Sequence, residues 1–361
     1  MNNAGLASVD LVDNLALAIH RKVRGGSVAL RGAPHAKRSG QEGSRADRTT
    51  VLYIGGIGRS GTTLLERSIG QDGEVVQLGE VMHLWKRSLR YDESCGCGSP
   101  FSECEFWGEV GRRAFGGWSE VDIDRVLELK AQVDRAVMVP KVLLASPDSS
   151  WGRAVAEYAS YYVRIYQAAA HVTGARVVVD SSKQSSLAYI LAGRPELDLR
   201  VLHCVRDARA VAHAWGKEVV RPEARTADVA LMTRYRPSRL SMYWMVHNAE
   251  MDGLGTFAGV PKVRVRYEDW VTDPRSTVLS VREFAGLDDD AGADHLGDGT
   301  VRLEPSHSCS GNPSRFATGV IEIRPDRRWI QDQSVRARRT VSLLTWPLML
   351  RYGYRMSGGV A

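Results

Sequence analysis

Short apolar runs recur along the chain, and each is followed by glycine or charged residues. They cover residues 51–54, 176–180, 199–205 and 262–267. Continuous apolar runs of this length are typical of strands that are buried on both faces of a sheet. Each gap between them is long enough for at least one helix, as the crossovers of a parallel sheet require. The pattern predicts a single-domain α/β fold whose parallel sheet is flanked by helices on both faces.

The two ends of the chain differ from this middle part. Residues 6–23 can form an amphipathic helix, and residues 24–49 are rich in Gly, Ser, Arg and Lys with little to bury. We therefore expect residues 1–49 to be an N-terminal appendage and flexible linker, followed by one domain over residues 50–355. The apolar residues 343–350 are too few to span a bilayer, and we expect them to dock on the core.

Composition and charge narrow the possible partners. The 361 residues are 43% hydrophobic and 25% charged, as in ordinary globular proteins, and the net charge of +6 favours an acidic partner. The aromatic residues are not interleaved with Lys and Arg as in nucleic-acid modules, so we expect no nucleic-acid partner. Asp10 and Asp13 interrupt the segment where a secretory signal would be apolar. We expect a cytoplasmic protein without a transmembrane segment.

A glycine-rich turn follows the first apolar run. Residues 56–63 (GIGRSGTT) have the glycine spacing of a phosphate-binding loop, and a helix is expected from residue 61 to about residue 69. Backbone N–H groups in such a loop, together with the positive end of the helix, can bind an anion. The fold is therefore predicted to be P-loop-like. The residues assigned to anion binding are Gly58, Arg59, Ser60, Gly61, Thr62 and Thr63.

This loop lacks the lysine on which nucleoside triphosphatases depend. Thr62 stands where their Gly-Lys-Ser/Thr motif has the Lys that reaches the β and γ phosphates. The loop suits a 5′-phosphate that carries a less charged leaving unit, with Arg59 as the cation and without a metal. A P-loop kinase or NTPase-like phosphotransferase is the alternative, and a tight turn without any ligand would also explain the glycines.

A second anion site is predicted at the end of another strand. Arg206 directly follows the apolar run 199–205. The carboxyl ends of parallel strands face the crevice where open α/β sheets bind ligands, and a guanidinium there can bind a phosphate through two N–H groups. Two anion sites on neighbouring strand ends favour a bisphosphate nucleotide as the ligand.

At this point the residues resemble the family of sulfotransferases that use 3′-phosphoadenosine 5′-phosphosulfate (PAPS). Residues 58–63 resemble its 5′-phosphosulfate loop, and residues 205–209 resemble its 3′-phosphate motif. Residues 180–183, 266–269 and 310–316 are similar to stretches of the bacterial members and of the tyrosylprotein and carbohydrate branches. Single motifs of this kind are weak signals, but five in the expected order are specific.

The resemblance implies a function for the domain over residues 50–355. It would be a sulfotransferase domain that moves a sulfuryl group from PAPS to a hydroxyl acceptor, without a metal and with a carboxylate as general base. The acceptor would be a small or medium-sized molecule, for example a natural product or a glycan.

Roles for single residues follow from the same resemblance. Glu80 is similar to the general base of the tyrosylprotein and carbohydrate branches, and His83, about one helical turn away, is the alternative base. Lys183 resembles the lysine that reaches the oxygen bridging sulfate and phosphate, and Arg59 would hold the sulfuryl oxygens. Arg315 resembles the residue that closes over the 3′-phosphate side of the nucleotide.

The chain departs from the family pattern at one position. The family usually has a Ser eight residues after the Arg of its 3′-phosphate motif, and here Ala214 follows Arg206 at that distance. Ala214 is therefore assigned to the cofactor site without a hydroxyl. His213, Trp215 or a backbone N–H group could replace the missing donor.

Two further regions are less informative. Cys95, Cys97 and Cys104 cluster within ten residues, but three ligands at a narrow spacing do not make a zinc site, so we expect no metal and a cysteine-pinned surface loop. Residues 217–247, rich in Arg and aromatic side chains, are expected to form a lid over the acceptor. The identity of the acceptor stays open.

Overall fold

The computed structural model describes residues 48–220, 231, 233–287 and 290–356. The predicted appendage over residues 1–49 lies outside these ranges except for Arg48 and Thr49, and Thr49 already begins the first strand. The rest of this section concerns the described residues.

A five-stranded parallel sheet forms the centre of the fold, with the strand order β2-β3-β1-β4-β5. Four of its strands coincide with the four predicted apolar runs, which confirms the predicted fold class. The fifth is a strand of only three residues at the edge, too short to produce a recognisable run. The strands are β1 Thr49–Gly56, β2 Val75–Gln77, β3 Val177–Lys183, β4 Leu197–Val205 and β5 Lys262–Arg266.

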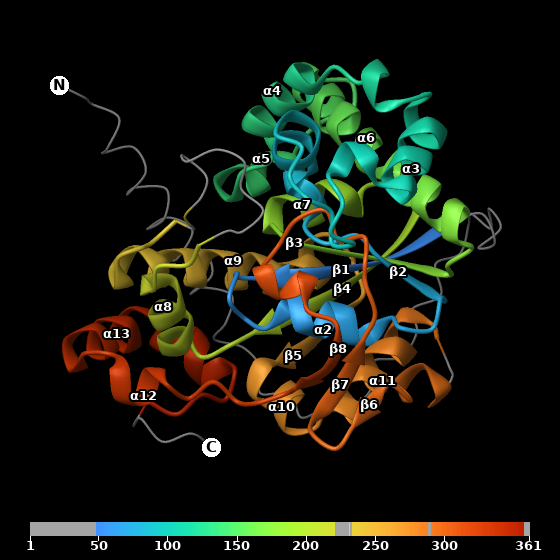
Figure 1. Cartoon of the computed structure of the whole chain (residues 1–361). Helices are drawn as coiled ribbons and strands as arrows, with labels where there is room; N and C mark the ends of the chain where they lie inside the picture. Colours follow the sequence, from blue (N-terminus) through green and yellow to red (C-terminus); the bar gives the residue numbers. More distant parts are fainter. Residues whose placement is uncertain (1–47, 221–230, 232, 288–289, 357–361) are drawn as a thin grey trace. The chain divides into compact units, whose positions relative to one another are not determined.

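Helices cover both faces of this sheet because its central strands are apolar on both sides. In β1, Val51 and Tyr53 pack into one core, and Leu52 and Ile54 pack into the other. Figure 1 shows the two layers above and below the sheet. On the first face lie α3 Glu105–Phe115, α4 Ile123–Val133, α5 Val139–Leu143, α6 Ser150–Thr173 and α7 Ser185–Ala192. On the second lie α2 Thr62–Ile69, α10 Tyr267–Thr272 and α11 Pro274–Ala285.

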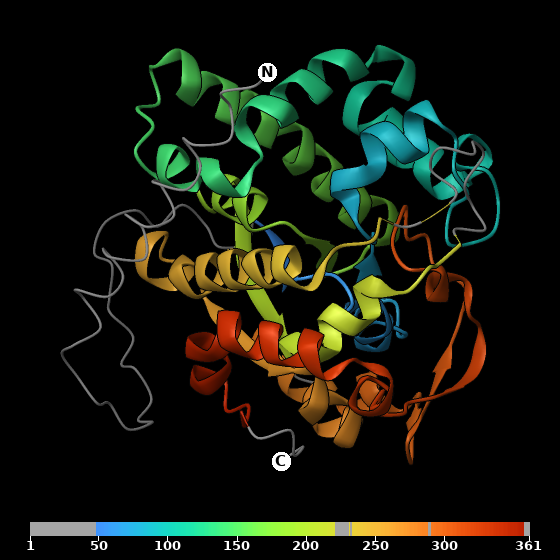
Figure 2. The ribbon, with the colours of Figure 1, turned by 90° about the vertical axis from the view of Figure 1, so that its left-hand side faces the viewer.

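A third apolar cluster lies at the β4 side of the phosphate loop. It joins α8 Ala208–Gly216, α9 Pro237–Phe257 and α13 Val335–Arg351, which follows the short α12 Trp329–Asp332. Figure 2 shows α9 and α13 lying side by side. Within the C-terminal apolar segment, Met349 is fully buried in this cluster and Leu348 packs against it, whereas Leu343, Leu344, Trp346 and Leu350 are exposed, so only one side of the segment docks on the core.

Other elements could not be anticipated from the sequence. A small antiparallel sheet consists of β6 Leu296–Gly297, β7 Thr300–Leu303 and β8 Gly319–Glu322, and a π-helical segment covers Leu84–Arg90. Their residues show no clear apolar period. Among the described helices, none combines the length and the apolar character that crossing a membrane would need.

Candidate active site

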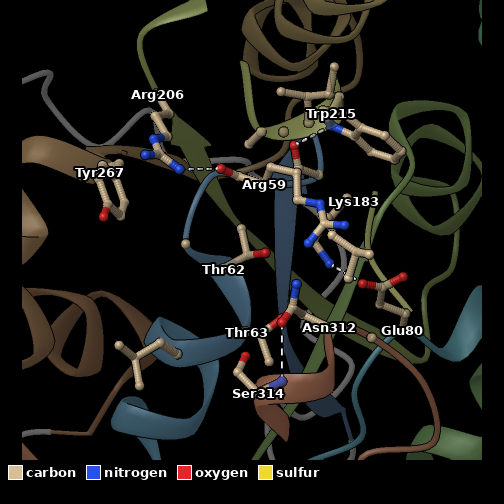
Figure 3. A pocket seen from close by; sticks show the side chains of 18 of the residues that line it. Arg59, Thr62, Thr63, Glu80, Lys183, Arg206, Trp215, Tyr267, Asn312 and Ser314 are labelled. Atoms are coloured by element: carbon tan, nitrogen blue, oxygen red, sulfur yellow. Dashed lines mark hydrogen bonds and ion pairs between the residues drawn. The ribbon is translucent and has the colours of Figure 1, made fainter. Parts of the chain in front are cut away.

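The carboxyl ends of β1, β3 and β4 open onto a pocket of about 790 Å³, shown in Figure 3. This is the edge at which open α/β sheets bind ligands. The structure brings most of the predicted site residues together there. Those that line the pocket are Gly58, Arg59, Gly61, Thr62, Thr63, Glu80, His83, Lys183, Arg206 and Ala214.

The phosphate loop owes its shape to two glycines. Gly61 precedes α2 with a φ of 76°, and a side chain there would come within 2.6 Å of the Tyr267 ring. A side chain at Gly58 would come within 2.9 Å of the Trp215 ring. Thr62, the first residue of α2, lines the pocket, so the N-terminal end of this helix opens onto it. Its backbone N–H groups and its partial positive charge suit an anion.

Ser60 differs from its neighbours in the loop. Its side chain is 2% exposed, does not line the pocket, and has a hydroxyl without a hydrogen-bond partner among the described residues. The prediction that Ser60 binds the cofactor therefore has no support from its side chain.

An ion pair joins the two predicted catalytic groups. Lys183 Nζ lies 2.6 Å from Glu80 Oε1 and also donates to the carbonyl oxygen of Ser181 at 2.9 Å. His83 Nε2 lies 3.4 Å from the other carboxylate oxygen of Glu80. Figure 3 shows Lys183 and Glu80 pointing toward each other inside the pocket. Lys183 is one of few non-glycine residues with a positive φ, 67°, and its backbone is therefore strained.

The ion pair controls the charge of Glu80. Burial by itself raises the pKa of this carboxyl, but the charge and the hydrogen bond of Lys183 outweigh burial and bring the pKa to about 2. Burial lowers the pKa of His83 well below its ordinary value, with Arg87 acting in the same direction. At neutral pH Glu80 is therefore a carboxylate and His83 a neutral imidazole.

A second buried carboxyl group fixes the backbone that presents this pair. Glu66 of α2 accepts hydrogen bonds from the Gly79 N–H at 2.8 Å and from the Ser181 hydroxyl at 2.6 Å. It thereby joins the segment that leads to Glu80 with the end of β3 that leads to Lys183. Burial raises the pKa of Glu66 to about 7. Glu66 could not be recognised from the sequence, because it lies within an ordinary amphipathic helix.

Arg206 occupies the predicted second anion position at the end of β4. It donates to the carbonyl oxygens of Arg59 at 2.9 Å and Asp326 at 3.2 Å, and it lies 3.4 Å from the Asp326 carboxylate. Its guanidinium stacks 4.1 Å from the centre of the Tyr267 ring. In Figure 3, Arg206 and Tyr267 are at one end of the pocket, and Lys183 and Glu80 are at the other.

The two side chains next to Ala214 do not replace its missing hydroxyl. Trp215 donates its indole N–H to the carbonyl oxygen of Gly58 at 2.9 Å and so supports the loop. His213 does not line the pocket, and its Nε2 lies 3.7 Å from Asp332 instead. Neither of these two side chains offers a donor in place of the hydroxyl.

The placement expected for Arg315 is contradicted by the structure. Its side chain is fully buried, and it donates to the carbonyl oxygens of Ser308 at 2.7 Å and Ser94 at 2.8 Å. These bonds hold Arg315 in the core, where it braces two loops. The pocket is lined from the same segment by Asn312 and Ser314.

Sequence reasoning missed several residues of the pocket. Arg328 lines it beside Asp326, to which it donates at 2.9 Å, and both come from the segment after β8. One arginine in a basic stretch carries no distinguishing signal. Tyr267 also lines the pocket, although no role in the site was assigned to it from the sequence.

Aromatic residues line the end of the pocket nearest α8 and α9. The ring centres of Trp215 and Tyr235 are 5.1 Å apart, and those of Tyr235 and Tyr243 are 5.3 Å apart. We call these three side chains, Trp215, Tyr235 and Tyr243, the aromatic wall of the pocket. Lys217 adds a cation beside them. Much of the predicted lid over residues 217–247, namely 221–230 and 232, lies outside the described residues.

The fold and the site define an α/β protein with a phosphate-type loop that lacks the nucleoside-triphosphatase lysine. A model of the sulfotransferase family matches residues 52–291, and the chain belongs to this family. Sulfuryl transfer, rather than the phosphoryl transfer of a kinase or NTPase, is the chemistry of that family. No curated protein matches the chain.

Several solved structures are similar to this chain at low identity. The sulfotransferase domain of the olefin synthase from Synechococcus PCC 7002 is 20% identical, with a TM-score of 0.48 over 87% of this chain and 98% of that one. A sulfotransferase domain from the curacin biosynthetic pathway is 12% identical, with a TM-score of 0.47 over 87% and 100%. Sulfotransferase STF9 from Mycobacterium avium is 12% identical, with a TM-score of 0.41 over 87% and 79%.

The ion pair makes a testable prediction for the Glu80 carboxyl. Lys183→Met keeps a long unbranched side chain at the strained position but removes the charge. Burial raises the pKa of Glu80, and the charge of Lys183 no longer lowers it in this variant. The pKa of Glu80 should therefore rise by roughly 1 to 3 pH units. Carboxyl-carbon NMR titration of glutamate-labelled protein measures this, with the exposed Lys86→Met as the matched control. An unchanged Glu80 pKa in Lys183→Met would contradict the ion pair.

Proposed function

We propose that residues 50–355 form a PAPS-dependent sulfotransferase domain that sulfates a hydroxyl group of a small or medium-sized acceptor, with no metal in the transfer step. The observation that carries this proposal is the Lys183–Glu80 ion pair beside a phosphate loop with Thr62 at the lysine position. Glu80 can act as a base and Lys183 as a cation, and both line the same pocket as the phosphate loop, which lacks the lysine of nucleoside triphosphatases. We expect the enzyme to work in the cytoplasm, where its five free cysteines stay reduced.

The 5′-phosphosulfate of PAPS would bind at the phosphate loop. The N-terminal end of α2 supplies N–H groups at Thr62 and Thr63, and Arg59 supplies a cation that lines the same cavity. Burial lowers the pKa of Arg59, but a guanidinium keeps its proton under all ordinary conditions. These groups would neutralise the phosphate and the sulfuryl oxygens.

The 3′-phosphate would bind at the opposite end, near Arg206. Arg206 and Arg328 line this end, and both lie against Asp326. The two guanidinium groups outnumber the one carboxylate, so the net local charge favours an anion. The Tyr267 ring stacks on Arg206 and restricts the orientation of its planar guanidinium group.

In the transfer step, the acceptor oxygen would form a bond to sulfur while the bond from sulfur to the bridging phosphate oxygen breaks. The electron pair of the broken bond stays on the phosphate oxygen, and the acceptor hydroxyl gives its proton to Glu80. An ammonium has three N–H groups. Lys183 uses one on Glu80 and one on the Ser181 carbonyl, so the third can donate to the leaving oxygen as its charge develops.

The same lysine links departure of the leaving group with proton removal. When negative charge grows on the leaving oxygen, Lys183 is attracted away from Glu80, and the pKa of Glu80 rises as it must for a general base. His83 is the alternative base, because its neutral imidazole can accept a proton and lines the same cavity.

The acceptor would enter over the aromatic wall. Tyr235, Tyr243 and Trp215 offer flat apolar faces, and Lys217 offers a cation. Aromatic faces stack on the rings of phenolic natural products and on the apolar faces of sugars. Natural products and glycans, the two examples of acceptors given from the sequence, would therefore both fit these side chains.

The catalytic roles predict a defined loss of activity. Glu80→Gln and Lys183→Met should each lower kcat by about a hundredfold or more, because they remove the proton acceptor and the donor to the leaving oxygen. Binding of the nucleotide product should change little in Glu80→Gln. Steady-state kinetics with PAPS and an accepted hydroxyl substrate measure both variants. If His83→Ala loses kcat while Glu80→Gln keeps it, the base is His83.

The departure at Ala214 gives a second test, on donor binding. Ala214→Ser places a hydroxyl at the pocket, and a hydrogen bond to a charged phosphate contributes roughly 1.5 to 3 kcal/mol. Binding of 3′-phosphoadenosine 5′-phosphate should tighten by roughly 10- to 100-fold. Adenosine 5′-phosphosulfate, which lacks the 3′-phosphate, is the matched control and should bind unchanged. Calorimetric titration of both ligands measures this, and equal changes would show that residue 214 does not face the 3′-phosphate.

A further inference from the structure

Three thiols and one imidazole converge beside α3, outside the pocket. Cys95, Cys97 and Cys104 come from the segment before this helix, and His307 comes from the segment that follows β7. Their four possible ligand atoms all lie within 4.8 Å of one another. Cys95 and Cys104 are buried, whereas Gly98 and Ser102 between them are exposed, so these two cysteines point inward from a loop that reaches the surface. The fourth ligand lies more than two hundred residues from the cysteines, which is why their spacing alone did not suggest a metal.

The separations of the ligand atoms match the edges of a tetrahedral metal site. Cys104 Sγ lies 3.6 Å from Cys95 Sγ and 3.9 Å from Cys97 Sγ. His307 Nδ1 lies 3.3 Å from Cys104 Sγ and 3.8 Å from Cys95 Sγ. Zinc bonds of about 2.3 Å to sulfur and about 2.0 Å to nitrogen, in a tetrahedron, put two sulfurs ~3.8 Å apart and a sulfur and a nitrogen ~3.5 Å apart.

A disulfide explains this arrangement less well. The sulfur atoms are 3.6 and 3.9 Å apart, whereas a disulfide needs about 2.05 Å. A disulfide between any two of the cysteines would also leave the third thiol and His307 without a role. Since one atom of each of the four residues points to the same place, a single ion accounts for all of them.

The surroundings hold His307 in the orientation that coordination needs. Its ring stacks on Phe106 with centres 4.7 Å apart and an angle of 21° between the planes. Its carbonyl oxygen accepts the indole N–H of Trp107 at 2.8 Å. The Gly96 N–H, between two of the cysteines, donates to the Ser308 carbonyl oxygen at 2.9 Å. These contacts join the two ligand-bearing segments beside the cluster and fix the imidazole, as partners outside a metal's ligands commonly do.

We propose that Cys95, Cys97, Cys104 and His307 bind one structural zinc ion. Three thiolates and one imidazole are a common ligand set for closed, four-coordinate structural zinc. With four protein ligands no coordination position stays open for a substrate. The ion therefore takes no part in sulfuryl transfer, and the proposal does not depend on the proposed function.

The ion would hold one wall of the active-site pocket. Three residues beyond His307, the carbonyl oxygen of Ser310 accepts the Glu80 N–H at 3.3 Å, and its hydroxyl accepts from Arg87 at 2.9 Å. Asn312, two residues further, lines the pocket. In Figure 1 the orange segment that carries these residues runs beside the segment before α3. Zinc would thus connect the C-terminal part of the domain to the segment that carries the proposed base.

The test is the metal content of the full-length chain. Protein made in zinc-supplemented medium, with any affinity tag removed, should contain about one zinc per chain by plasma mass spectrometry. Cys97→Ser and His307→Gln should bring this ratio close to zero. Cys204→Ser and His171→Gln, at positions outside the cluster, are matched controls and should keep it.

A second measurement covers the case in which the ligand variants do not fold. Wild-type protein grown with cobalt should show the intense visible bands of tetrahedral Co²⁺ and a near-ultraviolet thiolate-to-cobalt band that scales with three thiolates. Wild-type chain without bound metal, or with iron instead of zinc, would overturn the proposal. So would zinc retained in both ligand variants, a disulfide within the cluster found by alkylation and mass spectrometry, or a cobalt spectrum without thiolate bands.

Discussion

The ion pair between Lys183 and Glu80 is the interaction on which the rest of the site depends. It joins the ends of two neighbouring strands, because Lys183 ends β3 and Glu80 follows β2. The backbone of Lys183 is strained, at a cost of roughly 1 to 3 kcal/mol, and such strain persists only where the surroundings fix the conformation. Here they include the Lys183 bond to the Ser181 carbonyl and the Glu66 bonds that tie the two segments together. The pair is therefore held in place before any substrate binds, as electrostatic catalysis requires.

The pocket divides its charged groups between two ends, and the phosphate loop connects them. Arg59 contacts both ends of the pocket. Its side chain lines the cavity, and its carbonyl oxygen accepts a hydrogen bond from Arg206. Trp215 supports the same loop from α8 through Gly58. A change at one end can thus reach the other through the backbone of the loop. This coupling makes Ala214→Ser a cleaner probe of the 3′-phosphate than removal of Arg206, which would also release the loop.

The sequence sufficed for four of the five strands of the central sheet and for most of the pocket. Parallel strands buried on both faces leave apolar runs, and residues at their ends must share one edge, so Arg59, Lys183 and Arg206 could be placed together before the structure was known. Arg315 could not be placed, because the same local motif allows an arginine to face the pocket or the core. His307, the fourth residue of the cysteine cluster, could not be predicted from the sequence. It lies beside the cysteines only because the segment after β7 packs against α3.

If the pocket is a sulfotransferase site, it binds a bisphosphate nucleotide without a divalent cation. Calorimetric titration of the wild-type chain tests it most directly, with 3′-phosphoadenosine 5′-phosphate in one arm and ATP with magnesium in the other. We expect 3′-phosphoadenosine 5′-phosphate to bind with an affinity that added magnesium leaves unchanged. We expect no comparable binding of ATP with magnesium. Magnesium-dependent binding of ATP without binding of 3′-phosphoadenosine 5′-phosphate would contradict the assignment of a sulfotransferase site.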